Sequence, residues 1–267
     1  MEQGWSLSEI WFLSFFFVGI GVALLYVGVR FYFGVGPALV ASLLGFALVI
    51  ESGVVSVLWN PSLQPPLTNL AFLAALVCCE GVSWRRAVVT GVASGFLIEA
   101  HPVGVIALPA LLLFPVALAP SHRKGLDFGV VMLGACLGTW GAISGAALEG
   151  ALEWGADAFP VVGLFLLMAV GVWLARVGGG PLRSLSARSR GLWLSLSVVA
   201  LVLLANGLKL WLRGDYGTGP RYFFPALPAL SFLSAALCHR FRLLSGGRGV
   251  AAGLGMALVF FSLWGQR

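Results

Sequence analysis

The side chains with the clearest capacity for chemistry flank a proline. Glu99 and His101 stand where one apolar run ends and the next begins, and Pro102 interrupts the helical pattern directly after them. A carboxylate at this point can act as a base or hold a cation, and an imidazole can donate a hydrogen bond to a phosphate or hydroxyl oxygen. Ionisable groups this close to long apolar runs are costly, which favours a functional role. The alternative is a structural pair that bonds the backbone carbonyls freed by the proline.

A second candidate group opens a later apolar run. An arginine fork such as that of Arg221 can hold a phosphate, and the hydroxyl of Tyr222 can bond the same group. The alternative for both residues is anchoring at the membrane interface, which is also the role predicted for Lys209. Asn60, at the end of an earlier run, is a further candidate substrate-binding residue. Glu51 lies within a run, where packing or hydrogen bonding is favoured over catalysis.

Neither a metal site nor a cofactor is predicted. Glu149, Glu153 and Asp157 share one loop, which favours a solvated acidic face, with a divalent-cation site as the alternative. The cysteines lie inside apolar runs without metal-ligand spacing and are expected to be small buried hydrophobic residues. They are Cys78, Cys79, Cys136 and Cys238.

Composition places these residues in a membrane protein. Of the 267 residues, 60% are hydrophobic and only 10% are charged, and the mean hydropathy is +0.99. Soluble domains carry about 25% charged residues, so the water-soluble and disordered classes are excluded. The net charge of +6 does not indicate a nucleic-acid partner, because the basic residues interrupt apolar runs and form no stripe.

The apolar runs must position these side chains. About 20 apolar residues cross ~30 Å of hydrocarbon, and helices satisfy every backbone group there. No linker divides the chain, so the sequence predicts an all-α, polytopic transmembrane helical bundle with 1–267 as a single integral membrane domain. About ten apolar helical segments are expected, at 10–29, 35–58, 66–82, 87–100, 103–119, 126–145, 159–177, 191–212, 222–238 and 249–265.

The distribution of basic residues predicts which way the bundle faces. Twelve of the 16 Lys and Arg fall in one alternate set of loops and four in the other, so the richer set is expected in the cytoplasm. The exoplasmic mouth of the bundle is then expected to carry Asn60, Glu99, His101, Arg221 and Tyr222. Both termini are expected to be exoplasmic. The expected location is a bacterial or archaeal cytoplasmic membrane. The twelve are Arg30, Arg85, Arg86, Arg123, Lys124, Arg176, Arg183, Arg188, Arg190, Arg240, Arg242 and Arg248.

Two glycine pairs mark the segment 126–145. They are Gly134-x-x-x-Gly138 and Gly141-x-x-x-Gly145. Small residues spaced by four let helix backbones approach closely, so this spacing predicts close helix packing by that segment.

Taken in order, several motifs resemble the membrane part of the GT-C glycosyltransferases, in their protein-mannosyltransferase and aminoarabinose-transferase-like branch. One match runs from Trp59-Asn60-Pro61 through 70–76 and 91–102, which ends in Glu99-Ala100-His101-Pro102, to 108–114. The other is Arg221-Tyr222-Phe223-Phe224-Pro225-Ala226-Leu227-Pro228, similar to the family's Arg-Tyr-x-x-Pro-x-x-Pro. Together the matches cover about half of the chain.

The resemblance implies a polyprenyl-phosphate-linked sugar as donor and transfer at the outer membrane face. It would place His101, Arg221 and Tyr222 near the lipid phosphate, with Glu99 as a supporting acid. This placement is physically sensible, because a basic, desolvated pocket stabilises a departing phosphate. The family's first helix and its long acid-bearing outer loop have no counterpart here. The resemblance therefore leaves open an inactive relative, a partner chain that supplies this part, or a lost start.

Two other functions are compatible with the sequence. A non-catalytic membrane scaffold or assembly subunit of a larger complex would account for the missing acidic loop and the glycine-rich faces. A small-solute transporter is the third hypothesis. Secondary transporters are expected to carry an internal repeat and mid-span ionisable residues. This sequence has no convincing repeat and few such residues, so the transporter hypothesis is disfavoured. Membrane lipid is a partner in every case.

Overall fold

The computed structural model describes residues 7–51, 60–100, 102–119, 121–143, 184–213 and 220–240. Every regular element in these ranges is a helix and none is a strand, so the all-α prediction is confirmed for the described part of the chain. The longer helices are α1 (Leu7–Phe33), α2 (Val35–Glu51), α3 (Asn60–Glu80), α4 (Trp84–Ala100), α6 (His122–Ile143), α9 (Ala187–Arg213) and α10 (Leu227–Arg240).

Three stretches within these helices are long and apolar enough to cross a membrane. They are Trp11–Phe33, Leu63–Glu80 and Ala187–Gly207. Shorter apolar stretches, Val35–Ile50 and Gly104–Leu118, accompany them. The chain is therefore a helical membrane protein. The expected segments 159–177 and 249–265 lie outside the described residues.

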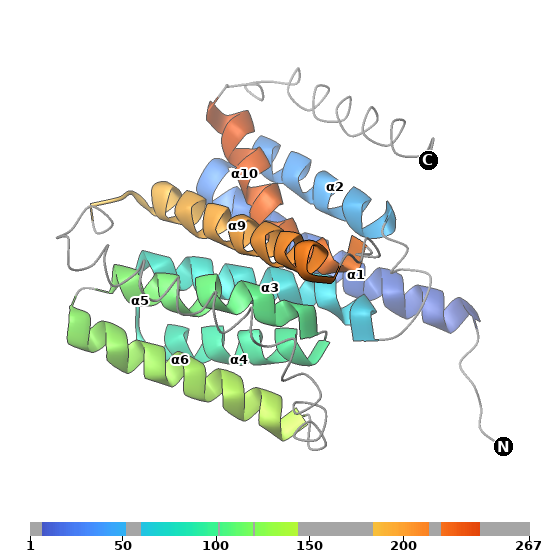
Figure 1. Cartoon of the computed structure of the whole chain (residues 1–267). Helices are drawn as coiled ribbons and strands as arrows, with labels where there is room; N and C mark the ends of the chain where they lie inside the picture. The colour runs from blue at the N-terminus through green and yellow to red at the C-terminus, as the bar shows by residue number, and fades with distance from the viewer. Residues whose placement is uncertain are drawn as a thin grey trace.

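α3 lies at the centre of the arrangement (Figure 1). On one side it packs against α1, which packs in turn against α2 and α10, and on the other side it packs against α4, which packs against α6. α9 contacts both α3 and α10 and so joins the two groups. The turn between α1 and α2 is a single residue, Gly34, whose φ of 86° is a conformation that favours glycine.

The expected helix over 103–119 is not a continuous α-helix. It is built from the 3₁₀ helix η2 (Pro102–Ala107), the π-helix η3 (Pro109–Leu113) and the short helix α5 (Phe114–Leu118). Pro109 and Pro115 have no backbone N–H, so each removes one hydrogen bond that a continuous helix would require. Irregular backbone at membrane depth is tolerated where it is buried in protein or lines a cavity.

The expected helix over 222–238 also begins irregularly. Its first part is the 3₁₀ helix η4 (Pro220–Ala226), and regular α-helix starts only at Leu227 in α10. Pro225 and Pro228 explain the break, since neither can donate a backbone hydrogen bond.

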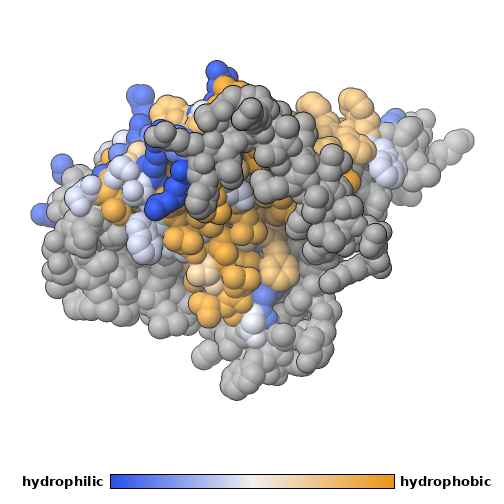
Figure 2. Space-filling view, turned by 90° about the horizontal axis from the view of Figure 1, so that it is seen from above, coloured by the Kyte–Doolittle hydropathy of each residue, from blue (hydrophilic) through white to orange (hydrophobic). Residues whose placement is uncertain are grey.

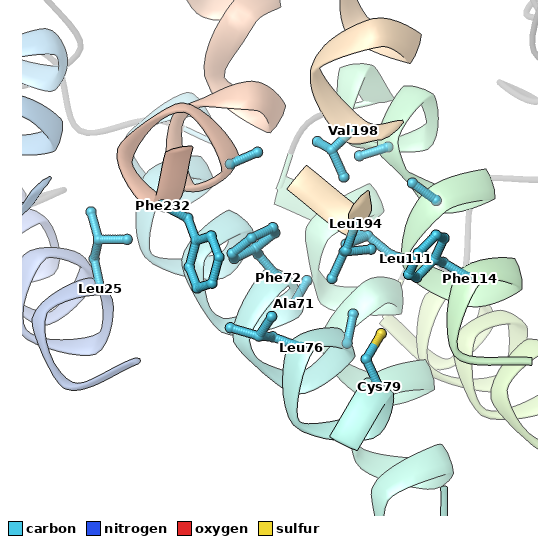
Figure 3. Close-up of a cluster of buried hydrophobic side chains, with 14 of the residues drawn as sticks. Leu25, Ala71, Phe72, Leu76, Cys79, Leu111, Phe114, Leu194, Val198 and Phe232 are labelled. Atoms are coloured by element: carbon cyan, nitrogen blue, oxygen red, sulfur yellow. The ribbon is translucent and has the colours of Figure 1, made fainter. Parts of the chain in front are cut away.

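Phe232 of α10 occupies the middle of the largest buried cluster. It has no exposed surface, and its ring centroid lies 4.9 Å from that of Phe33 and 6.0 Å from that of Phe72. Figure 3 shows Phe232 and Phe72 facing each other between α10 and α3, with Leu194 and Leu111 farther along the same core. The cysteines are buried, as expected, and all four are free thiols.

A glycine pair on α4 makes a close contact with the backbone of α6. A Cβ atom added to Gly91 would lie 2.3 Å from the carbonyl oxygen of Met132, and one added to Gly95 would lie 2.6 Å from that of Cys136. Only hydrogen at these positions allows the backbones of α4 and α6 to come so near.

The close packing predicted for the glycines of α6 is not seen among the described residues. A Cβ added to Gly134, Gly138 or Gly141 would meet nothing within 4 Å. α6 packs on α4 through the opposite face, which carries Met132 and Cys136, so these glycines point outward. Gly145 lies outside the described residues.

The outer surface of the bundle is strongly apolar. Phe31 is 76% exposed and Val130 is 71% exposed, values suited to lipid contact and not to water. Figure 2 shows such residues forming a continuous hydrophobic patch, with hydrophilic residues gathered mainly toward the left of the view, the side on which α9 begins.

Arginines of α9 bind the C-terminal carbonyls of two other helices. Arg188 donates from Nε to the carbonyl oxygen of Tyr32 at 2.8 Å, and its Nη1 lies 3.1 Å from Nε2 of His239. Arg190 donates from Nη1 to the carbonyl oxygen of Cys79 at 3.1 Å. Helix C-termini leave carbonyls unpaired and carry partial negative charge, so these cations hold the ends of α1 and α3 against the start of α9.

The same end of the bundle includes the connection from α3 to α4. The hydroxyl of Tyr32 donates to Oε1 of Glu80 at 2.5 Å, and Arg86 donates to the carbonyl oxygen of Gly81 at 2.8 Å. Trp84 at the start of α4 contacts Phe128 in α6, with ring centroids 5.5 Å apart. The described basic residues assigned to the cytoplasmic loops therefore stand at helix termini that meet at one end, hereafter the basic end.

Candidate functional site

The candidate residues belong to helix ends at the opposite side of the bundle, hereafter the outer end. Asn60 is the first residue of α3, which finishes at the basic end, and Glu99 is in the last turn of α4, which begins there. Arg221 and Tyr222 lie in the first turn of η4, after α9 has crossed from the basic end. His101, between α4 and η2, lies outside the described residues.

The elements that carry these residues pack together. η2, which directly follows His101, contacts η4, which carries Arg221 and Tyr222, and both contact α9. η4 also contacts α3. Glu99 is half-buried, and only the backbone positions of Asn60, Arg221 and Tyr222 are described. The shared outer end is thus a feature of the backbone, and a common pocket formed by these side chains stays a prediction.

Other expected residues fall beyond what the structure describes. Glu51 ends α2 and Lys209 lies near the end of α9, but neither side chain is described. The acids Glu149, Glu153 and Asp157 lie outside the described residues. Within the described ranges there is no group of three or more His, Cys, Asp or Glu side chains that could hold a metal ion.

A narrow crevice lies beside η4. It runs between α1, α2 and α3 and is lined mainly by apolar side chains, with Phe224 and Leu227 on one wall and Pro65 on another. Asn69 is the polar side chain in the lining, and its Nδ2 donates to the carbonyl oxygen of Gly21 at 2.8 Å. The crevice is apolar and small, with room for about one water molecule.

Sequence reasoning missed the buried polar face at the start of α3. The stretch Asn60–Pro66 was expected in an outer loop, but it forms the first turns of α3, since Pro61 occupies a helix position where a missing N–H costs nothing. Gln64 is consequently inside the helix with no exposed surface, and Thr68, one turn on, is 2% exposed. The spacing of four between them, repeated at Phe72, is the signal that could have placed both on the core side.

No protein-family model, curated protein or solved structure matches this chain. The resemblance to GT-C glycosyltransferases thus depends on the motifs in the sequence alone.

Proposed function

We propose that this is a GT-C-like integral membrane protein related to transferases that use polyprenyl-phosphate-linked sugars at the exoplasmic face. The observation that supports the proposal best is the contact between η2 and η4 at the outer end. These two irregular segments carry, or directly follow, the two motifs of the resemblance, although more than a hundred residues separate them in the chain.

The chemistry available at this end suits a lipid-linked phosphate. Arg221 offers a fork of N–H donors and His101 offers a ring N–H, and both stabilise negative charge that develops on a departing phosphate in a site of low dielectric. Glu99 could accept a proton from an attacking hydroxyl.

The proposed orientation follows from the basic end. Described arginines and Lys124 occupy the helix termini there, and the positive-inside rule assigns such an end to the cytoplasm. The outer end and both termini then face the exterior of a bacterial or archaeal cytoplasmic membrane.

Donor binding tests the site directly. Binding of a polyprenyl phosphate to the purified chain in detergent is compared for wild type, His101→Ala, Arg221→Ala and the matched control Lys209→Ala, which removes a cation predicted to be an anchor at the same end. Loss of one charged phosphate contact should weaken binding by roughly tenfold or more, with little change in the control. Unchanged binding in both site variants would remove the assignment.

A membrane assembly subunit is the second candidate, favoured by a specific surface. Gly134, Gly138 and Gly141 form an open face on α6, flanked by the exposed side chains of Val130 and Leu137. Such a face lets the helix of another membrane subunit approach closely. Co-purification with a stable larger complex that is disrupted by Gly138→Leu, without bound lipid phosphate, would favour this function over transfer.

A further inference from the structure

The described cations at the basic end fall into two groups. One group donates to backbone carbonyls at the ends of α1 and α3 and consists of Arg86, Arg188 and Arg190. Arg85 and Lys124 differ, because both side chains are exposed and neither makes a hydrogen bond or an ion pair with any described residue. They lie in the first turns of α4 and α6, and neither first turn carries an acidic residue that would balance their charge.

α4 and α6 are parallel, and their first turns are level. Gly91 of α4 lies against the backbone of Met132, and Gly95, one turn on, lies against that of Cys136, also one turn on. Both helices therefore run away from the basic end in the same direction. The rings of Trp84 and Phe128 are 5.5 Å apart near the two N-termini, so the first turns stand side by side.

The seam between α4 and α6 has one covered flank. Gly129 of α6 faces Val116 of α5 there, and α6 itself lies at the edge of the bundle (Figure 1). Successive residues of an α-helix turn by about 100° in the same sense. Counted from the residues that meet in the seam, this rotation puts Arg85 and Lys124 together on the flank opposite α5. Arg123 falls instead on the side of α6 that points away from α4.

The flank opposite α5 carries apolar surface below its two cations. Val88, one turn after Arg85, is 43% exposed, and Val131, two turns after Lys124, is half-buried. Trp84 is 57% exposed at the level of the cations, which is the position of aromatic residues at a membrane interface. These four residues, Arg85, Val88, Lys124 and Val131, are hereafter the open flank.

A phospholipid has the complementary arrangement, with a charged phosphate above hydrocarbon. Guanidinium and ammonium groups both donate to phosphate oxygens. The acid nearest to the pair along α6 is Asp127, which is exposed and one turn from Lys124, so the two cations still exceed the negative charge beside them. A lipid with net negative charge balances this excess, whereas a zwitterionic lipid does not.

We infer that the open flank binds an anionic phospholipid from the membrane leaflet at the basic end. Arg85 and Lys124 bind its headgroup phosphate, and one acyl chain lies along Val88 and Val131. Basic sites between transmembrane helices are known to recognise anionic headgroups in this way. The site is separate from the outer end and does not depend on the function proposed for it.

The test compares lipid binding to the purified full chain in a neutral detergent. The probes are phosphatidylglycerol and phosphatidylcholine with identical acyl chains, of which only the first carries a net negative charge. One cation favours an anionic lipid about fivefold, so wild type should prefer phosphatidylglycerol by about twenty-fivefold. Arg85→Ala and Lys124→Ala should each lose about fivefold of this preference, and the double variant should lose nearly all of it. Equal binding of the two lipids by wild type would overturn the inference.

Arg123→Ala is the matched control, since it removes an exposed cation next to Lys124 in the chain but on the far side of α6. It should keep the full preference, and a loss equal to that of Lys124→Ala would show that total charge attracts the lipid and that no defined site exists. Arg85→Gln and Lys124→Gln keep long polar side chains and replace any alanine variant that fails to fold. Inorganic phosphate is the third probe and should bind far more weakly, because it makes no apolar contact. Binding as tight as that of phosphatidylglycerol would assign the cations to a soluble anion instead.

Discussion

The contact between α4 and α6 provides the sharpest test of the fold. Replacing Gly91 by alanine puts a Cβ atom 2.3 Å from the carbonyl oxygen of Met132 and 2.8 Å from the Cβ of Ala135. Carbon and oxygen atoms in contact normally lie about 3.3–3.6 Å apart. The helices must therefore separate by about 1 Å, and overpacking of this kind costs about 1–3 kcal/mol.

The matched control is Gly138→Ala on α6, where the added Cβ would meet nothing within 4 Å. Both substitutions gain the same helix propensity of alanine over glycine, about 1 kcal/mol, so this contribution cancels in the comparison. Gly91→Ala should accordingly be less stable than Gly138→Ala by about 1–3 kcal/mol. Reversible unfolding with increasing mole fraction of SDS, followed by circular dichroism, measures the difference.

A double variant separates the two collisions at Gly91. Ala135→Gly removes the methyl group at 2.8 Å but leaves the backbone oxygen of Met132 in place. Adding Ala135→Gly to Gly91→Ala should therefore recover only part of the lost stability. Equal stability of Gly91→Ala and Gly138→Ala would refute the close approach of these two helices.

Three further substitutions test the basic end and the core. Arg188→Ala removes the donor to the Tyr32 carbonyl and should lower stability in SDS titration by about 1 kcal/mol; no change would mean that the carbonyl is equally well bonded without it. Tyr32→Phe removes the hydroxyl that donates to Glu80 and should cost about 1 kcal/mol in the same assay, with the helical content of the folded state unaltered. Phe232→Ala empties the centre of the core and should cost roughly 1–3 kcal/mol, less than in a soluble protein, because lipid is as apolar as the core that the ring leaves. A thermal melt of Phe232→Ala that matches wild type would contradict the packing between α10 and α3.

The two glycine pairs show why spacing alone does not predict helix packing. Gly91 and Gly95 have the same spacing as Gly134 and Gly138, yet the first pair faces a neighbouring helix and the second faces outward. Spacing places two glycines on one face of a helix, but it does not say whether another helix covers that face. The lipid-facing and protein-facing sides of a membrane helix are both apolar, so hydropathy does not separate them either.

The grouping of helix ends at the outer end was predictable from the sequence, and a binding site formed there stays a prediction. The alternation of runs and basic loops indicated that the segments carrying Asn60, Glu99 and Arg221 share one end, and their helices do finish or begin there. Gln64 was missed because a run rich in proline and polar residues is typical of a loop. Its helical conformation and complete burial depend on neighbours that are distant in the chain.

Composition and hydropathy alone establish a membrane-embedded helical protein. A long apolar run that crosses hydrocarbon must bond its backbone N–H and C=O groups internally, and a helix is the simplest structure that does so. They also separate a basic end from an outer end, since charged residues must lie where helices reach water. Tertiary structure was needed to show which helix faces meet, where prolines convert regular helix into η2, η3 and η4, and which polar side chains are enclosed without a partner. Those features arise from contacts between residues far apart in the chain, and local sequence patterns do not predict such contacts.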